Sequence, residues 1–578
     1  MSKINNQQGI GLIVFFSAVL AAGAVFLLST ISNNNSRTSN QNATTESLAQ
    51  AKEALLSYAV SYYLGQSSTG VSRAGIHGLL PCPENKNTST LSEGTQMADC
   101  ASTHENSLGR LAWKSLDIPP LKDASGECLW YAVSGGFFNE PKSPMTNADT
   151  PGMFQIYNEQ AVLAKGATPE DRVVAVVIAP GVSLSYQNRL DASGSGLPCK
   201  IARSAVSATD YLDNYLGINN AVVDTVNADQ IDDFITSNGL QTNPSLNDQI
   251  ITITTNDIFN AIKKNNAQYK LKMNTLADTF VTCLANYANN SNNEFQLTSG
   301  SGGGTGTPST CLSDCRDDCD AVRNLCILSS PSGPARAQCQ LDRTACRSTC
   351  TTTCSSSGGG TSSTTAFNLP WPTPIDVGGD FRTHANYSDS NAVANTLGRF
   401  PFTTPLSNTP PFTQDITIDP GCSLSIANDE YRLLWQNWKD HWFYITHTDY
   451  LPGASSTQNS TACAGANCLT VNGNSYASLL IFSDSRLPSA PFNQLRQDPY
   501  IEGITVAGNL KTELSNYLEG TNATSSTANT SLVFGDYTAL TPADQASVND
   551  RIYCINITSA GVTQGYTYNL LTNDPECN

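Results

Sequence analysis

The most apolar stretch of the chain lies near its start. Residues 10–28, IGLIVFFSAVLAAGAVFLL, contain no charged side chain. A helix of this length spans roughly 28 Å, close to the apolar thickness of a bilayer of about 30 Å. The run is longer than the apolar part of a typical signal peptide, and no small-x-small cleavage site follows it. We therefore expect a retained, single-pass transmembrane helix in the inner membrane, with the bulk of the chain outside the cytoplasm.

A second helical pattern follows an Asn-rich stretch. In ESLAQAKEALLSYAVSYYLG, apolar residues recur at positions 48, 51, 55, 58, 59, 62 and 63. This spacing places them on one face of a helix. We expect residues 10–65 to form a transmembrane and amphipathic helical region, whose distal half lies on a sheet.

Short runs of β-branched and aromatic residues, bounded by Gly, Pro and Asn, predict strands in the remainder of the chain. The run RVVAVVIAPG (172–181) is almost continuously apolar. Such a run suits a central strand that is covered on both faces. The expected fold class is α+β, with a sheet and a packed helix in each module.

The strand-like phrases occur twice, in the same order. SLGRLAW (107–113) matches TLGRFPF (396–402), and LWYAVS matches WFYITH. RVVAVVIAPG matches YASLLIFSDSRL, LDNYLGIN (212–219) matches LSNYLEGTN (514–522), and LNDQIITI matches VNDRIYCI. The last two phrases keep the same spacing in both copies. We expect an internal duplication, with α+β modules at 66–255 and 366–578 and a helical connector at 256–297.

Eight cysteines between the modules have mirror-image spacing. Four lie on one predicted helical stripe before the SSPSGP bend, and four repeat that stripe in reverse after it. Thiolate clusters also bind zinc, but no CxxC knuckle occurs here. We expect an antiparallel helical hairpin at 311–354, flanked by flexible Gly/Ser/Thr linkers within 298–365. The mirror symmetry predicts four disulfides: Cys311–Cys354, Cys315–Cys350, Cys319–Cys346 and Cys326–Cys339.

The other ten cysteines are expected to join loops. The predicted pairs are Cys82–Cys100, Cys463–Cys468 and Cys554–Cys577, with Cys128–Cys199 and Cys283–Cys422 remaining. Disulfides in this number require an oxidising compartment. The net charge of −18 is spread along the chain, which argues against nucleic acid as a partner because phosphates require a basic face.

No known catalytic motif stands out. HExxH and GxSxG are absent from the sequence, and no Gly-rich loop precedes a helix as a phosphate site requires. We expect no enzyme activity, no cofactor and no metal. Asp440 with His441, and His447 with Asp449, suggest a metal or general-base role, but packed histidines are the simpler interpretation. The turns at 146–152 and 191–196 offer oxygen ligands for calcium, although ordinary Asx turns explain both. The histidines are His77, His104, His384, His441 and His447.

Three tryptophans form a candidate binding feature. Trp435, Trp438 and Trp442 recur at one helical stripe. Exposed aromatics in such a row could bind carbohydrate. Burial of the stripe against the second sheet is the interpretation we favour.

The N-terminus resembles a type IV prepilin leader. A short polar leader, residues 1–9 with one Lys, ends in Gly9, and the apolar run begins at Ile10. The resemblance implies cleavage after Gly9 and methylation of Ile10. Most such subunits carry Glu at mature position five, where this chain has Val14. Tip-located minor pseudopilins of type II secretion systems lack that Glu, so the departure argues against a major, polymerised pilin and leaves a minor or tip subunit open. The Cys-rich segment separately resembles the CxxxC hairpins of plant α-hairpinin peptides.

GLLPCPE, LGRLAW, ECLWYAVS and VVAVVIAPG together resemble large pilin-like proteins of Gram-negative bacteria. The resemblance implies a structural and interaction protein, in the membrane or in a cell-surface filament, with adhesion as one expected role. Its expected partners are other pilin-like subunits through the first helix, the membrane, and a surface ligand or a host or secreted protein. A periplasmic binding protein anchored in the inner membrane, outside any filament, is the alternative. A secreted-type hydrolase is the third hypothesis.

Overall fold

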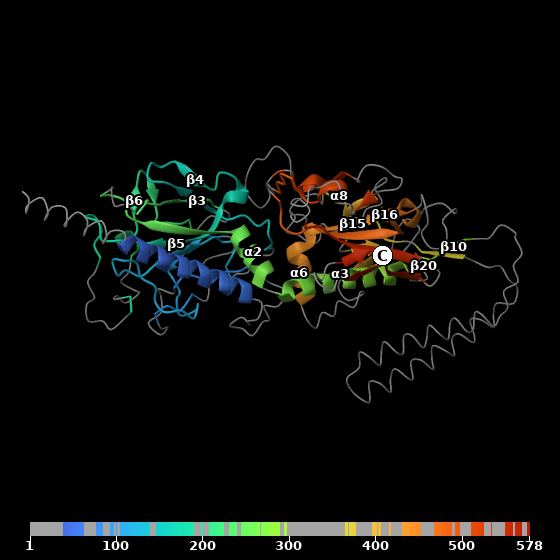
Figure 1. Ribbon diagram of the computed structural model, residues 1–578, viewed down its shortest axis with the longest axis horizontal. Helices are drawn as coiled ribbons and strands as arrows, with labels where there is room; N and C mark the ends of the chain where they lie inside the picture. The colour runs from blue at the N-terminus through green and yellow to red at the C-terminus, as the bar shows by residue number, and fades with distance from the viewer. Residues whose placement is uncertain are drawn as a thin grey trace, which may run out of the picture.

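The protein has a mixed α+β fold in which two sheet-containing modules lie side by side along the long axis (Figure 1). A computed structural model describes a defined subset of the chain. The described residues are 39–62, 77–84, 93–97, 100, 105–138, 146–189, 198–199, 207–224, 230–239, 244–265, 267–288, 294–297, 364–367, 369–376, 396–401, 403–405, 415–417, 430–451, 468–487, 490, 492–496, 510–524, 533–534, 549–558, 561–568 and 575–577.

The first module is a sheet covered by the helix over residues 39–61, drawn in dark blue in Figure 1. Its apolar stripe, Leu48, Ala51, Leu55 and Ala59, is buried in the main core, as the sequence spacing predicts. The strands run in the order β1-β2-β5-β3-β4, with β9 paired to β5 and β8 paired to β3. Their bounds are β1 (Ser107–Arg110), β2 (Trp130–Val133), β3 (Phe154–Tyr157), β4 (Leu163–Lys165), β5 (Val173–Ala179), β8 (Asp232–Ile235) and β9 (Gln249–Thr254).

Every residue of β5 is buried, which confirms the expected central strand. Ala175 and Val177 face the core beneath the helix, while Val176 and Ile178 face a second cluster that contains Tyr211. Alternating side chains of a strand point to opposite faces. Burial of both faces therefore requires an apolar residue at every position.

The second module has a five-stranded sheet of order β12-β15-β18-β20-β21. Helix α3 (Ala267–Ala288) covers it, and the Asn274 and Asp278 side chains accept hydrogen bonds from the Tyr553 and Tyr566 hydroxyls at 2.7 and 2.5 Å. The strands are β12 (Leu397–Arg399), β15 (Trp442–Thr446), β18 (Ser478–Phe482), β20 (Arg551–Thr558) and β21 (Gly561–Gln564). Helix α6 (Glu430–Trp438) precedes β15, and the short α8 (Gly520–Thr524) lies near β19.

The expected connector at 256–297 is thus divided differently. Helix α2 (Thr255–Asn265) follows β9 directly and contacts both modules, since Phe259 lies against Gly78 and Trp438. Helix α3 belongs with the second sheet instead. Its buried residues, among them Met273, Phe280 and Leu284, recur every three or four positions, as do the buried residues of the helix on the first sheet.

Four strands correspond between the two sheets in order, direction and register. In the first sheet Gly109, Tyr131, Val177 and Ile251 are successive cross-strand partners. The equivalent row in the second sheet is Gly398, Tyr444, Leu480 and Tyr553. The matched sequence phrases therefore fall on matched strands.

A Leu-Pro-x-Pro segment enters each sheet in the same way, which the phrase comparison missed. The Leu80 amide donates to the Phe137 carbonyl at 2.6 Å, and the Leu369 amide donates to the Tyr450 carbonyl at 2.6 Å. The following prolines lie against glycines of β1 and β12. A Cβ added at Gly109 would approach the Pro83 Cβ at 2.9 Å, and one at Gly398 would approach the Pro372 Cβ at 2.8 Å. Only glycine fits where the segment crosses the edge strand.

The remaining strands form small sheets. A β10–β11 pair joins the two ends of residues 298–363, so this insertion leaves and returns at adjacent points of the second module. The other sheets are β17-β16-β19, β13-β14, β22-β23 and β6-β7. Their strands are β6 (Asn214–Tyr215), β7 (Ile218–Asn219), β10 (Glu294–Leu297), β11 (Thr364–Phe367), β13 (Thr403–Pro405), β14 (Asp415–Thr417), β16 (Leu469–Val471), β17 (Asn474–Tyr476), β19 (Val533–Phe534), β22 (Tyr566–Tyr568) and β23 (Pro575–Cys577).

Three disulfides join described residues. Cys82–Cys100 and Cys554–Cys577 confirm two predicted pairs, and Cys128–Cys199 confirms one of the two that remained. Cys468 is also disulfide-bonded. The predicted partners Cys463 and Cys422, and all eight cysteines of the 311–354 hairpin, lie outside the described residues. Cys283 is buried on α3.

No helix among the described residues combines the length and the apolar character needed to cross a bilayer. The predicted leader with Gly9 and Ile10, and the apolar run at 10–28, lie outside the described residues.

Candidate functional site

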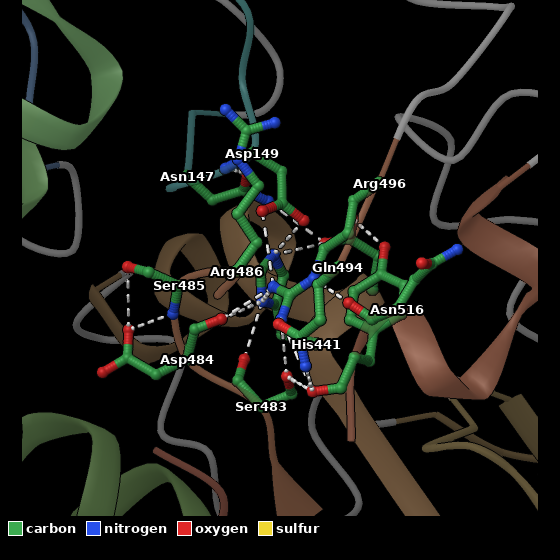
Figure 2. Close-up of polar contacts among 12 residues, drawn as sticks. Asn147, Asp149, His441, Ser483, Asp484, Ser485, Arg486, Gln494, Arg496 and Asn516 are labelled. Carbon is green, nitrogen blue, oxygen red and sulfur yellow. Dashed lines mark hydrogen bonds and ion pairs between the residues drawn. The ribbon is translucent and has the colours of Figure 1, made fainter. Parts of the chain in front are cut away.

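A buried cluster of charged side chains lies between the modules. Asp149 comes from the loop at 146–150 of the first module. Asp440 and His441 come from the 3-10 turn η6 (Lys439–His441), and Lys511 comes from η9 (Leu510–Thr512) of the second module. Figure 2 shows Asp149 pointing towards His441 and Arg496. Each of these five side chains is at most 2% exposed.

The loop that carries Asp149 is held in shape by Asn147. The Asn147 Oδ1 accepts from the Asp149 amide at 2.9 Å. The Asn147 Nδ2 donates across the interface to the Asn437 carbonyl at 2.8 Å and to Asp440 Oδ1 at 3.1 Å. The 146–152 turn, considered above for calcium, thus directs its polar groups into the second module.

Oppositely charged side chains contact one another inside the cluster. Lys511 Nζ lies 2.5 Å from Asp440 Oδ2 and 3.9 Å from Asp149 Oδ2. Arg496 Nη1 lies 3.3 Å from Asp149 Oδ1, and His441 Nε2 lies 3.1 Å from Asp149 Oδ2. Burial alone would raise the pKa of Asp149, but Arg496, His441 and Lys511 outweigh it and hold that pKa well below its usual range. Burial also opposes ionisation of Asp440, and Lys511 with His441 lowers its pKa.

The donor set of Asp149, Asp440 and His441 resembles a metal site, because one ligand atom of each lies within 4.8 Å of the others. The cations of the protein already occupy that environment. Lys511 contacts both carboxylates, and Arg496 contacts Asp149. A divalent ion would meet two fixed positive charges at short range in a buried site, which is costly. The cluster is therefore better described as an ion-pair network that joins the modules.

The described histidines are packed. His441 is fully buried, and its Nδ1 lies 2.7 Å from the Ser483 carbonyl. The His447 ring accepts from the Asp449 amide at 3.2 Å and begins the turn that follows β15. Burial lowers the pKa of His77 to about 3, with a smaller contribution from Lys272, so its ring is neutral at pH 7. His104 and His384 lie outside the described residues.

The three candidate tryptophans are buried to at least 99% of their surface, so they form no exposed binding platform. Trp435 and Trp438 lie on α6, but Trp442 is the first residue of β15. The prediction that all three tryptophans lie on one helix was therefore wrong for Trp442, because the turn η6 ends the helix. Trp442 packs on Phe482 with ring centroids 4.8 Å apart, and Trp438 contacts Phe259 of α2 at 5.5 Å. These side chains stabilise the second core and its boundary with the first module.

A second polar feature occurs once in each module. In the first module Asp213 Oδ2 accepts from the Asn247 and Asp248 amides at 2.6 and 2.8 Å. Asp248 Oδ2 accepts in return from the Asp213 amide and from Asn220 Nδ2, both at 2.8 Å. Gln187 Nε2 donates to Asp213 Oδ1 at 2.9 Å. We name this arrangement the carboxyl pair.

The second module repeats the carboxyl pair with Glu519 and Asp550. Glu519 Oε2 accepts from the Asn549 and Asp550 amides at 3.3 and 3.0 Å. Asp550 Oδ2 accepts from the Glu519 amide at 2.9 Å and from Asn522 Nδ2 at 3.0 Å. Gln494 donates to Glu519 as Gln187 does to Asp213.

Burial, followed by the charge of the neighbouring carboxylate, raises the pKa of Asp248 and of Asp550 well above the usual value. The Oδ1 atoms of both residues are buried without a hydrogen-bond acceptor or donor among the described atoms. Each pair thus holds two acidic side chains together in a buried site, where their mutual repulsion favours the protonated form of one of them.

Each pair is braced by an arginine over a tyrosine ring. Arg189 lies 5.1 Å from the Tyr211 ring centroid, and Arg496 lies 4.3 Å from that of Tyr517. The sequence signal for this arrangement is the repeated Gln-x-Arg at 187–189 and 494–496, which the phrase comparison did not use. Arg496 has a second role that Arg189 lacks, since it also contacts Asp149 at the interface.

The structure corrects one of the matched phrases. Tyr211 and Tyr517 each follow a 3-10 turn, η4 (Ala208–Asp210) and η10 (Leu514–Asn516), so Tyr517 corresponds to Tyr211. The alignment of LDNYLGIN with LSNYLEGTN paired it with Tyr215 instead. The first module has the β6–β7 hairpin between Asp213 and Asn220, whereas in the second module Glu519 is followed almost directly by Asn522. The extra residues of the hairpin offset the error in the alignment, so the misaligned phrases showed equal spacing.

No protein-family model matches the chain, and comparisons with curated proteins and with solved structures find no match either. The fold itself defines an α+β protein with two sheet-containing modules and disulfides.

Proposed function

We propose that the protein is a membrane-anchored, extracytoplasmic structural and interaction protein of pilin-like architecture, acting as a minor or tip subunit of a type IV pilus or type II secretion-like filament. We attribute the two modules to duplication, and each has a helix laid on a sheet. The four matched strands are antiparallel in both sheets, while the first sheet also contains the parallel pair β3–β8. The proposal assigns membrane insertion to residues 10–28 and contact with partners to the modules and the Cys-rich insertion. The adhesive role and the other pilin-like subunits as partners belong to the same proposal.

The observation that carries the proposal is the position of the first helix. The described part of this helix starts at residue 39, ten residues after the apolar run, and its stripe is buried on the first sheet. A chain that continues from an apolar segment into a helix on a sheet has the order expected of a pilin-like subunit. The three disulfides between described residues support export, because such bonds persist in oxidising compartments.

The described chemistry supports a structural role over an enzymatic one. His441 and Asp440, the residues considered for catalysis, are fully buried and engaged with Ser483, Lys511 and Asp149. A general base must reach the proton that it removes from a substrate. These side chains have no exposed surface through which to do so.

Mass spectrometry of the native, membrane-extracted protein tests the proposal. The expected N-terminus is methylated Ile10. An N-terminus at Met1 or Ser2 on a membrane-bound protein would favour the anchored periplasmic binding protein outside any filament. Recovery of the protein in the cytosol with reduced cysteines would contradict both.

A further inference from the structure

The exposed apolar side chains of the described residues are concentrated at one end of the first module. Seven large apolar side chains are at least 43% exposed, and five of them lie in loops of this module. Single exposed apolar residues are common on protein surfaces, so their grouping is the informative feature. The five are Val162, Val182, Tyr186, Leu216 and Val222, which together we name the anchor-proximal face.

These loops lie at the same end of the module as residues 39–44, the first described residues of the helix. Gln41 Nε2 donates to the Asn238 carbonyl at 3.3 Å, and the Asn238 amide donates in turn to Glu159 Oε1, in the 158–162 turn that carries Val162. Thr44 Oγ1 accepts from the Ala124 amide at 3.1 Å. Figure 1 places β6 at the same end of the long axis as the start of the dark blue helix.

The loop with Val182 and Tyr186 is linked to the same end. Ser125, next to Ala124, donates through Oγ to the Gly181 carbonyl at 2.8 Å. The Val182 carbonyl accepts from Asn247, and the Tyr186 hydroxyl donates to Asp213 at 3.1 Å. Asp213 directly precedes the β6–β7 hairpin, so this hairpin belongs to the same surface.

Two of the five side chains are presented by turns with unfavourable backbone. Leu216 at the tip of the β6–β7 hairpin has φ +51° and is 61% exposed. Ala161, which precedes Val162, has φ +54°. A left-handed conformation costs a residue other than glycine about 1–2 kcal/mol. Side chains this exposed do not recover that cost by packing inside the module. At the corresponding described positions of the second module, Glu519 is followed by the short helix α8 instead of a hairpin.

The length of chain before residue 39 limits what can cover this face. Only residues 29–38 separate the apolar run from the described helix. Ten residues span at most about 35 Å when fully extended. If residues 10–28 cross the bilayer, residue 39, at the same end of the module as the anchor-proximal face, is held within about 35 Å of the membrane surface.

We propose that the anchor-proximal face rests on the bilayer interface, with Leu216, Val222, Val182, Tyr186 and Val162 inserted among the lipid headgroups. This inference depends on the membrane anchoring proposed above. Leu and Val provide apolar area for such a contact, and Tyr is enriched at membrane interfaces. The net charge of −18 opposes binding to anionic lipid, so apolar contact with zwitterionic lipid is the expected mode.

Tryptophan scanning in vesicles of brominated phosphatidylcholine tests this. The full chain is reconstituted as Leu216→Trp, as Val222→Trp, and as the control Leu271→Trp on α3, which is 48% exposed. The wild-type emission is subtracted because the chain has six tryptophans of its own. We expect bromine to quench the added emission at least about twofold at 216 and 222, and not at 271, because only the first two lie at the lipid interface. Because two sites are tested, the measurement remains valid if one of the two variants fails to fold.

The outcomes separate the two proposals. If the chain floats with vesicles but bromine quenches the added emission at neither 216 nor 222, the proposed contact is overturned and the proposed anchor is unaffected. If the emission at these sites changes with protein concentration and not with bromination, the face contacts another copy of the chain. That result also overturns the proposed contact with the bilayer. Failure of the chain to float with vesicles overturns the anchor and, with it, this inference.

Discussion

Arg496 and Asp149 are separated by 347 positions in the chain, yet Arg496 Nη1 lies 3.3 Å from Asp149 Oδ1 in a site closed to solvent. Beside Tyr517, Arg496 also donates to Gln494 Oε1 and to the Asn516 carbonyl. One side chain thereby connects the interior of the second module to the loop of the first. The relative position of the modules depends on this contact and on the neighbouring charges.

Replacing Asp149 should loosen the contact between the modules. Asp149→Ala leaves Arg496 buried without its carboxylate partner, and removing one partner of a buried ion pair typically costs about 3–5 kcal/mol. We expect earlier urea unfolding, with separate transitions for the two modules, and faster proteolysis between them. Glu53→Gln, at an exposed position of the first helix, serves as the control. A single transition unchanged in midpoint would contradict the role of the cluster.

The carboxyl pairs should make the protein more stable as the pH falls. Because the pKa of Asp248 is raised in the folded state, the folded protein holds a proton that the unfolded chain releases above about pH 4. The free energy of unfolding should then decrease by about 1.4 kcal/mol per pH unit above that point, until the folded-state pKa is passed.

Asp248→Asn mimics the protonated side chain and should flatten this dependence, as measured by urea unfolding between about pH 5 and pH 8. Asp550→Asn should do the same in the second module. Asp257→Asn is the matched control. The Asp257 pKa is lowered, because hydrogen bonds from Thr254 and Lys52 outweigh burial, so its contribution to stability is present above about pH 4 and lost as the pH falls further. An unchanged slope in both carboxyl-pair variants would show that neither pair retains a proton.

The two glycines beneath the Pro-x-Pro segments should tolerate no side chain. In Gly398→Ala the new Cβ would meet Pro372 and the Thr373 backbone, and Gly109→Ala would meet Pro83. We expect each variant to lose about 1–3 kcal/mol, as overpacking usually does. Gly136→Ala is the control, since its Cβ would meet only Thr150 at 3.5 Å. Thermal unfolding measures the differences, and equal midpoints for all three variants would contradict the close approach.

Three disulfides should survive purification without reductant. Peptide mapping after alkylation should recover Cys82 with Cys100, Cys128 with Cys199, and Cys554 with Cys577. Cys128–Cys199 closes the longest of these loops, so Cys199→Ala should cost about 3–5 kcal/mol of stability by the chain-entropy estimate. Alkylation of these six cysteines before reduction would rule out the pairings.

Local patterns predicted much of the fold. The apolar run at 172–181 gave a central strand because both faces of β5 are covered, and the helical stripe at 48, 51, 55 and 59 is buried as its spacing requires. The alignment of repeated phrases also matched β1 with β12 and β2 with β15. In each case neighbouring residues in the sequence carry the information.

The interface and the carboxyl pairs could not be predicted in the same way. Asp149 and Lys511 meet only because the modules pack together, and nothing near either residue in the sequence specifies the other. The equivalence of Tyr211 and Tyr517 was hidden by the β6–β7 hairpin, which restored equal spacing between phrases that do not correspond. The stripe of tryptophans ended at Trp438, because a single 3-10 turn converts the helix to strand β15.

The pairing of β10 with β11 has a consequence for how such a chain can vary. Glu294 and Phe367 are register partners, so the two ends of the insertion are already closed by backbone hydrogen bonds. Closing a loop of different length at such a site changes the entropy only slowly with the number of residues. A sequence of quite another kind could be exchanged there while the second sheet folds as before, which makes this junction a natural place for related chains to acquire new specificity.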